Sequence, residues 1–368
     1  MADNNQTPTT NSALPFTFGG FEIPAGCRRI FVTAELEPSN GDPRIQPTGF
    51  PDVGPVLYPD PSGQSGNICL IESEASMANR LEEVCFSNKY EGTLKDVFHG
   101  LPYLRAESGT SQNAVFRTSS TLDGHRFASD FLAKGRGDFG NGTNTLAEYI
   151  KTTLGMEDGG KTMPISNVPN IFPLVCELDT MSLIHGFQVS NEQISFVGLR
   201  LARALSASIV GLGCERMSVP GIKFNVGQVE SESGQAIFQK QRVTAKKIEA
   251  RFSIDVALLT SLRLDTPADN GAPGQRQTSR ARLLLGIALW KVAAFLDLLR
   301  VELSLRTECK LRLQHAIEPR ARLEGDNNPS EVDFPFTAVV AASLTGDDGL
   351  IARAQLPANR SPLTLLFA

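Results

Sequence analysis

Polar and apolar residues alternate along three stretches of the chain. The alternation runs from Arg29 to Glu37, from Lys247 to Leu258 and from Val301 to Leu313. A period of two is typical of a strand that buries one face and exposes the other. The pattern therefore predicts three one-sided strands.

Between the last two strands, residues 281–299 form a strongly apolar segment that is long enough for a helix. Its uncharged run is limited by Arg282 and Lys291, so it is too short to span a bilayer. We therefore expect a core helix. The region 248–313 then becomes a strand–helix–strand unit that closes the core.

A fourth signal lies at residues 68–82, where an apolar strand end passes into a helix. Ser73 stands at the N-cap position, and Glu74 in the first turn favours the helix dipole. The helix divides into two faces. The core-facing side would hold Met77, Ala78, Leu81, Val84 and Cys85, and the other side would hold Ser76, Asn79, Arg80 and Glu83.

The start of this helix combines free backbone N–H groups with two serines, an asparagine and Arg80, which suits a phosphate group. An ordinary capped amphipathic helix would show the same pattern. Local chemistry alone leaves both interpretations open.

The remaining elements are shorter. Patterns predict strands at 101–105 and 114–118, helices at 122–133 and 143–154, and either a helix or a strand broken by Arg203 at 199–210. Two segments resemble loops. Residues 38–67 contain seven prolines and five glycines, and residues 218–242 are polar with three glycines.

An early strand and helix followed by a late strand, helix and strand predict an α+β fold. We expect an RRM-like or ferredoxin-like antiparallel sheet, with helices on one face, in a single domain over residues 1–368 with long loop insertions. The uncovered face of such a sheet can meet RNA. Its outward positions include few aromatic residues, which favours contact with an RNA backbone over base stacking. The basic residues expected there are Arg251, Arg306, Lys310 and Arg312.

The net charge of −5 does not by itself indicate a nucleic-acid partner, but the charges are unevenly distributed. Residues 1–110 hold 7 Lys/Arg and 14 Asp/Glu, whereas residues 200–251 hold 9 and 4 and residues 276–322 hold 10 and 4. This asymmetry fits a basic groove on an otherwise acidic protein, or a solvated basic face without a partner.

Cysteine spacing and the N-terminal sequence limit other classes of protein. The six cysteines include no C-x-x-C pair, so we expect neither a zinc site nor a disulfide framework, and no metal or cofactor. The N-terminal residues lack the basic and apolar regions of an export signal, so we expect a cytoplasmic protein without a membrane segment.

Three apparent catalytic or nucleotide-binding patterns lack the required context. Residues 155–162 match a phosphate-binding loop by letters, but a helical segment precedes them and Pro164 follows. Residues 135–140 match G-x-G-x-x-G after a helix-like segment, and are better explained as a loop. His125 lies near Ser119 and Ser120 without a nucleophile elbow, so binding or packing is the better interpretation.

The run Glu72-Ser73-x-x-Ser76-Met77-Ala78-Asn79-Arg80-Leu81-Glu82 resembles the signature of a CRISPR protein family. That family is the backbone subunit of type I-G (formerly I-U) Cascade complexes, the Csb-one-like RAMP proteins. Other segments resemble the family in the same order. They are Gln46 to Asp52, Thr118 to Ser120 with His125-Arg126, Arg203 to Ser206, and Gly221 to Lys223. The resemblance also favours a strand at 199–210.

The resemblance implies a non-catalytic protein whose copies line up in a helical filament along a guide RNA (crRNA) and present it to target DNA. Partners would include the Cascade large subunit and a fused small RAMP/processing subunit. Residues 218–242 would be a thumb hairpin that reaches over the guide. We expect RNA contacts at the following positions: Ser73, Ser76, Asn79, Arg80, His125, Arg126, Arg203, Lys223, Lys240 and Arg242.

Two alternatives remain. A metal-dependent ribonuclease of the type III backbone kind would use Asp42 or Asp52, which lie in the loop after the first strand. A general RNA-binding protein outside CRISPR systems would share the basic segments. The sequence resembles the type I backbone subunits more, and these are not nucleases, so we interpret Asp42 and Asp52 as loop residues.

Overall fold

The computed structural model describes residues 15–50, 54–109, 113–140, 143–194, 198–217, 242–265, 273–315, 317–326, 328–335, 337–357 and 360–367. The long insertion at 218–241 lies outside this set, together with Asp52, Lys223 and Lys240. All statements about structure below concern the described residues.

One large antiparallel sheet organises the molecule. Its strands lie in the order β20-β21-β3-β19-β16-β7-β6, and β22, which pairs with β23, also pairs with β3. The bounds are β3 Cys27–Pro38, β6 Leu57–Pro59, β7 Asn67–Glu72, β16 Leu205–Leu212, β19 Lys247–Asp255, β20 Leu303–Arg306, β21 Cys309–Leu313, β22 Arg320–Gly325 and β23 Ser330–Asp333. The twelve residues of β3 pair with β22 along their first part and with β21 along their last part.

The strand order is that of a split βαβ fold. In chain order the core strands are β3, β16, β19 and the β20–β21 hairpin, and in space the hairpin lies beside β3, followed by β19 and β16. Helix α1 (Glu74–Glu83) lies in the chain between β3 and β16, and α7 (Pro273–Val301) lies between β19 and β20. The predicted α+β, RRM-like class is confirmed.

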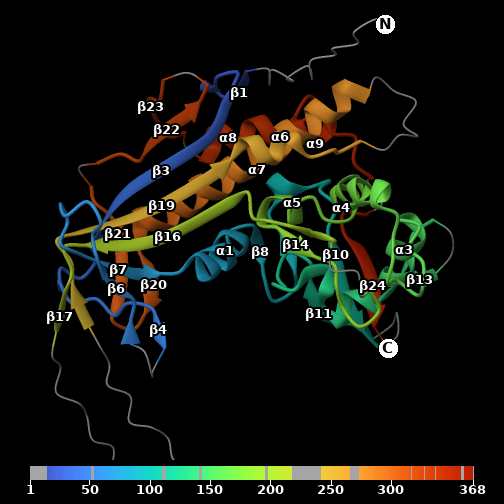
Figure 1. Ribbon diagram of the computed structural model, residues 1–368, viewed down its shortest axis with the longest axis horizontal. Coiled ribbons are helices and arrows are strands. Elements are labelled where there is room, and N and C mark those ends of the chain that lie inside the picture. Colours follow the sequence, from blue (N-terminus) through green and yellow to red (C-terminus); the bar gives the residue numbers. More distant parts are fainter. Residues whose placement is uncertain are drawn as a thin grey trace, which may run out of the picture.

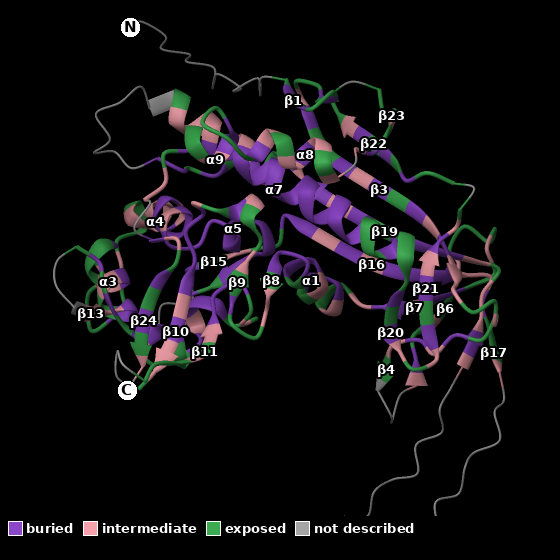
Figure 2. Ribbon diagram, turned by 180° about the vertical axis from the view of Figure 1, so that it is seen from behind, coloured by how far each residue is buried: buried purple, intermediate pink, exposed green. Residues whose placement is uncertain are grey.

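The helices cover one face of this sheet. In Figure 1, β3, β19 and β16 lie in front of α7. Figure 2 views the molecule from behind, and α7 and α1 lie on that side of the sheet. The apolar residues of each strand point to that covered face, where Ile30, Phe252 and Ile209 pack into one core with Phe295 and Leu289 of α7. Burial of this face, through the alternation seen in the sequence, holds the sheet and helices together.

A second, smaller sheet lies beyond α1 (Figure 1). Its order is β11-β10-β24-β12-β13, with β10 and β24 parallel and the other pairs antiparallel. Its strands are β10 Leu104–Ser108, β11 Val115–Ser119, β12 Arg136–Asp138, β13 Thr143–Thr145 and β24 Leu363–Phe367. Most of this sheet is therefore inserted between α1 and β16, and the last described strand completes it.

The other elements are short. The strands are β1 Phe16–Phe18, β2 Phe21–Ile23, β4 Gly49–Phe50, β5 Gly54–Pro55, β8 Phe86–Asn88, β9 Thr93–Leu94, β14 Phe187–Gln188, β15 Arg200–Leu201, β17 Glu215–Met217 and β18 Arg242–Thr244. The helices are η1 Asp96–Phe98, η2 Arg126–Ala128, α2 Asp130–Ala133, α3 Leu146–Thr153, η3 Ile165–Asn170, α4 Ile171–Leu178, α5 Ser182–His185, α6 Val256–Ser261, α8 Thr337–Leu344 and α9 Leu350–Arg353.

Two predicted strand boundaries are wrong. The predicted strand at 301–313 is a hairpin, β20–β21, that turns at Thr307 and Glu308. The strand from residue 247 ends at Asp255, because the Asp255 carboxylate caps α6 by accepting a hydrogen bond from the Leu258 amide at 2.9 Å.

Three further segments differ from the predictions. The predicted helix at 122–133 is broken, because Arg126 adopts a φ of +47°. The loop 38–67 contains β4, β5 and β6, and β6 is an edge strand of the main sheet. The glycine-rich stretch after residue 134 contains β12, where Gly137 packs closely against Leu365.

No helix within the described residues has both the length and the apolar character needed to cross a membrane.

Candidate nucleic-acid interface

The start of α1 is the first part of the candidate site. The Ser73 hydroxyl oxygen accepts a hydrogen bond from the Ser76 amide at 3.3 Å, and Met77 and Leu81 are fully buried beneath the helix. The amides of Glu74 and Ala75 precede the first intrahelical hydrogen bonds. Farther along the helix Asn79 is exposed, so this side of α1 presents polar groups to solvent, as predicted.

A buried carboxylate organises this end of the helix. Glu72, Ser76 and Arg80 follow one another at intervals of four residues. Glu72 ends β7 just before the helix, and Ser76 and Arg80 lie along one line of α1. Glu72 is 2% exposed, and its Oε1 accepts hydrogen bonds from the Ser76 hydroxyl and from Arg80 Nε, the latter at 3.3 Å. Arg80 keeps 23% of its side chain exposed.

Arg306 binds the other oxygen of the same carboxylate. Its Nη1 donates to Glu72 Oε2 at 2.7 Å, its Nε donates to the Gln46 carbonyl at 2.9 Å, and its Nη2 donates to the Ile71 carbonyl. One negative charge thus faces two guanidinium groups, and the cluster has a net charge of +1. A net positive cluster at an exposed helix start suits an anionic ligand.

The position of Arg306 corrects the expectation that it points outward from the sheet. A β-bulge lies between Ser304 and Arg306 in β20, and another irregularity lies beside Glu72, where β7 meets Ile209 of β16. A bulge redirects the side chains of a strand. Here it turns Arg306 from the edge strand of the sheet toward β7, near the opposite edge of the sheet.

The β20–β21 turn also holds the base of the insertion at 218–241. Glu308 forms a bidentate ion pair with Arg242 of β18, and its carbonyl accepts a hydrogen bond from the Gln46 amide at 3.1 Å. Ile45 and Val243 exchange two backbone hydrogen bonds of 2.9 and 3.0 Å. The loop at 45–48, the start of α1 and the base of the insertion therefore meet at one turn.

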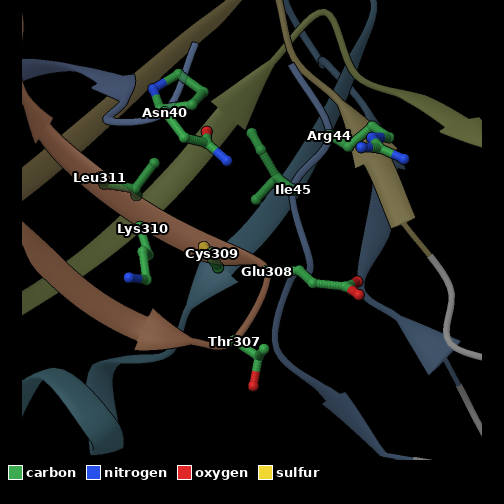
Figure 3. A pocket seen from close by; sticks show the side chains of 9 residues that line it. Asn40, Arg44, Ile45, Thr307, Glu308, Cys309, Lys310 and Leu311 are labelled. Carbon is green, nitrogen blue, oxygen red and sulfur yellow. The ribbon is translucent and has the colours of Figure 1, made fainter. Parts of the chain in front are cut away.

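A small hollow lies behind this turn (Figure 3). Figure 3 shows Asn40, Ile45 and Leu311 around it, whereas the side chains of Glu308 and Lys310 point away from one another. The space suits a water molecule and is too small for a nucleotide. The hollow is therefore a packing defect rather than a ligand pocket.

The other end of α1 is sealed. Glu82 and Arg126 each have 6% of their side chain exposed and form a buried ion pair. The Arg126 guanidinium also donates to the Ser120 carbonyl at 3.0 Å and to the Gly186 carbonyl at 2.9 Å. Burial raises the pKa of Glu82, and the charges of Arg126 and Lys291 oppose that rise.

A second buried contact adjoins this pair. Lys291 of α7 lies with its Nζ 2.8 Å from His185 Nε2, and both side chains are inaccessible to solvent. Because an ammonium group has only donors, Nε2 is the acceptor and Nδ1 carries the hydrogen. Burial, reinforced by the charge of Lys291, holds the pKa of His185 well below its usual value.

The structure divides the predicted RNA contacts into two groups. Ser73 and Ser76 lie at the start of α1, and the side chain of Arg80 reaches back from the last turn to Glu72 beside them. Asn79 is exposed next to Arg80, and the β20–β21 turn brings Arg242 to the same side. The second group lies around the buried Glu82–Arg126 pair near the C-terminal end of α1. It consists of His125, Arg126 and Arg203.

Within the second group the residues differ in access. His125 and Arg203 are exposed, and their side chains make no hydrogen bond or ion pair with any other part of the chain that the structure describes. The backbone at Arg203 packs against Gly186, the residue whose carbonyl binds Arg126. Arg126 itself is buried with its guanidinium occupied, so it supports the fold and we remove it from the contact set. Lys223 and Lys240 lie outside the described residues.

On the open face of the large sheet, basic side chains form ion pairs with acidic side chains of the same sheet. Cross-strand partners form ion pairs there, among them Arg29 with Asp255 at 3.1 Å and Lys247 with Glu35 at 2.6 Å. Arg251 pairs with Glu249 at 2.7 Å. The accessible side of α1 is therefore a better candidate for binding an anionic ligand than this face.

Sequence reasoning missed the two residues that organise the site. The spacing of Glu72, Ser76 and Arg80 could have drawn attention to Glu72, because residues four apart on a helix are neighbours. No local signal could have found Arg306, which is 234 residues from Glu72.

A comparison with known families identifies the chain's relatives. The family model described as CRISPR-associated protein GSU0053 (Cas_GSU0053) matches residues 30–216, just over half of the 368 residues. The chain belongs to this CRISPR-associated family. The match spans β3, α1 and β16, and therefore includes both ends of α1; it stops before Arg242 and Arg306. No curated protein matches the chain.

Proposed function

We propose that this member of the CRISPR-associated family binds guide RNA as the non-catalytic backbone subunit of a type I-G Cascade complex. The observation that carries the proposal is the family match over β3, α1 and β16, the elements that build the exposed start of α1. Copies of the protein would line up along the crRNA, with the other Cascade subunits and target DNA as further partners.

The geometry supports contact with the RNA backbone. The guide would pass along α1, with Ser73 at its start, Asn79 and Arg80 on its accessible side, and His125 and Arg203 near its C-terminal end. Cations and helix amides hold phosphates without regard to sequence, so target recognition would remain with base pairing. Arg242, at the base of the insertion, would contribute once its pairing with Glu308 is relaxed.

The contact between Asp42 and Arg44 argues against the ribonuclease alternative. Both carboxylate oxygens of Asp42 lie 2.9 Å from Arg44 Nε, and this hydrogen-bonded partner lowers the pKa of Asp42 to about 2. A metal ion would have to displace Arg44 to use this carboxylate. No group of three or more His, Cys, Asp or Glu side chains within the described residues is arranged to hold a metal.

Sequencing of co-purified RNA tests the proposal. The protein would be expressed together with a repeat–spacer array, and we expect repeat–spacer transcripts to dominate the bound RNA. The R353A variant, which removes an exposed arginine on α9, should retain this RNA, whereas R80A should lose most of it. Bound RNA that mirrors the total cellular pool would contradict the proposal and favour a general RNA-binding protein.

A cleavage assay separates the ribonuclease alternative. Labelled target RNA would be incubated with a divalent metal and with wild type, Asp42→Ala or Asp52→Ala. We expect no difference among the three proteins. Metal-dependent products that disappear in one variant would establish nuclease activity instead.

A further inference from the structure

The β20–β21 turn reaches the candidate site from outside the matched family segment. The three donor nitrogens of Arg306 bind three acceptors in two separate segments, the loop between β3 and β4 and the end of β7. Arg306 joins an edge strand of the sheet to β7 and lies directly behind the start of α1. The Arg306 side chain is only partly exposed, with 23% accessible to solvent.

The contact with Glu72 has a consequence for Arg80. A carboxylate presents two oxygens in one plane, and Arg306 occupies Oε2 while Oε1 faces Ser76 and Arg80. The orientation of the Glu72 carboxylate is therefore set from behind by Arg306. Arg80 uses only its Nε for Glu72, and no described residue accepts a hydrogen bond from its Nη1 or Nη2.

We propose that Arg306 is a positioning residue for the phosphate-binding site: it fixes Glu72, and through Glu72 it aims the free Nη1 and Nη2 groups of Arg80 at an RNA phosphate. This inference rests on the proposed function. Arg306 itself does not touch the RNA.

A preorganised donor loses less conformational entropy when it binds than a freely rotating one. The Arg80 side chain, released from Glu72, would sample many rotamers in solvent. Loss of Arg306 should therefore weaken RNA binding through Arg80 and by no second route.

A double-mutant cycle tests this dependence. Fluorescence anisotropy would measure binding of a labelled single-stranded RNA, one repeat with its spacer, to wild type, R80A, R306A, R80A/R306A and the control R353A. We expect R80A and R306A each to weaken binding about tenfold, the loss expected for one charge-assisted hydrogen bond. The double variant should bind no more weakly than the weaker single variant.

Losses that multiply in the double variant would overturn the proposal, because they would show that Arg306 acts independently of Arg80. Unchanged binding in R80A would contradict the proposed binding site itself, which separates the two failures. R353A should bind as wild type does.

The R306K variant separates positioning from charge. Lysine keeps the positive charge but cannot hold a carboxylate and two carbonyls at once. We expect R306K to bind RNA nearly as weakly as R306A, with a native circular dichroism spectrum. Wild-type affinity and salt dependence in R306K would show that Arg306 acts as a simple charge. Loss of the native fold in both R306A and R306K would give Arg306 a purely structural role, and either result would overturn the proposal.

Discussion

The two ends of α1 carry the same kind of ion pair in opposite environments. At the start, Glu72 binds Arg80, whose side chain reaches back from the last turn and keeps two guanidinium nitrogens free of other described groups. At the end, Glu82 binds Arg126, whose guanidinium is enclosed and fully occupied by Glu82 and two carbonyls. One helix therefore offers a cation at one end and uses another to hold the fold at the other end.

The difference shows that an arginine's role depends on its remaining donors more than on its place in a motif. His125-Arg126 and Asn79-Arg80 both belong to segments that resemble the same family. Only the second leaves guanidinium nitrogens available. Arg126 also adopts a left-handed backbone conformation, which costs free energy and persists where surrounding contacts impose it.

The largest expected loss of stability follows from removing Arg126 from the buried ion pair with Glu82. Replacing Arg126 by Met leaves the Glu82 carboxylate buried without its partner, which should lower the free energy of unfolding by about 3–5 kcal/mol. Urea denaturation of wild type and R126M measures this loss.

Two other variants provide comparisons for the unfolding free energy of R126M. R80M should change the free energy of unfolding by no more than about 1 kcal/mol, because the exposed head of Arg80 is solvated. R117M, at an exposed strand position, should stay within about 0.5 kcal/mol of wild type. Equal losses in R126M and R80M would erase the distinction between the two ends.

The dependence of stability on pH tests the buried contact between His185 and Lys291 next to the sealed end. Because the pKa of His185 is held well below its usual value of 6.5, the unfolded chain takes up a proton as the pH falls below about 6.5 while the folded chain does not. The stability that this group contributes is present above that pH and is lost on acidification. The loss can reach about 1.4 kcal/mol per pH unit.

The variant H185Q tests this effect, since a glutamine can accept the hydrogen bond from Lys291 without titrating. Its stability measured at pH 7.5, 6.5 and 5.5 should fall less steeply than that of wild type, whereas R353A should keep the wild-type slope. An unchanged slope in H185Q would mean that His185 is protonated in the folded protein.

The smallest expected change in stability comes from substitutions of Ser73 at the start of α1. Ser73→Ala removes the side-chain cap of α1 and should cost about 1 kcal/mol, whereas Ser73→Gly should cost only a few tenths. Thermal unfolding monitored by circular dichroism would rank the two variants. A greater loss in S73G than in S73A would indicate that the cap contributes less than backbone rigidity does.

The periodic elements were predictable because one face of each is buried. The alternation along β3 and β19 and the cap at Ser73 survive in the structure, since burial of alternate residues and a side-chain cap act over a few neighbouring residues. The fold class followed from their order along the chain.

The errors occur where distant residues decide the conformation. Alternation continues from Val301 to Leu313, yet the chain turns at Thr307, where Glu308 is drawn to Arg242 and Arg306 to Glu72. Likewise, the apolar spacing around Phe127 favours a helix, but Arg126 is held by Glu82, 44 residues away. Neither partner can be identified from the local sequence.

Mapping of RNA crosslinks along α1 tests the central claim most directly. Trypsin cleaves after Arg44, Arg80 and Lys89, so it separates the start of α1, in peptide Ile45–Arg80, from its sealed end, in peptide Leu81–Lys89. A guide RNA containing 4-thiouridine would be crosslinked to the protein by ultraviolet light and the peptides identified by mass spectrometry. We predict crosslinks in Ile45–Arg80 and none in Leu81–Lys89; crosslinks confined to Leu81–Lys89 would contradict the account.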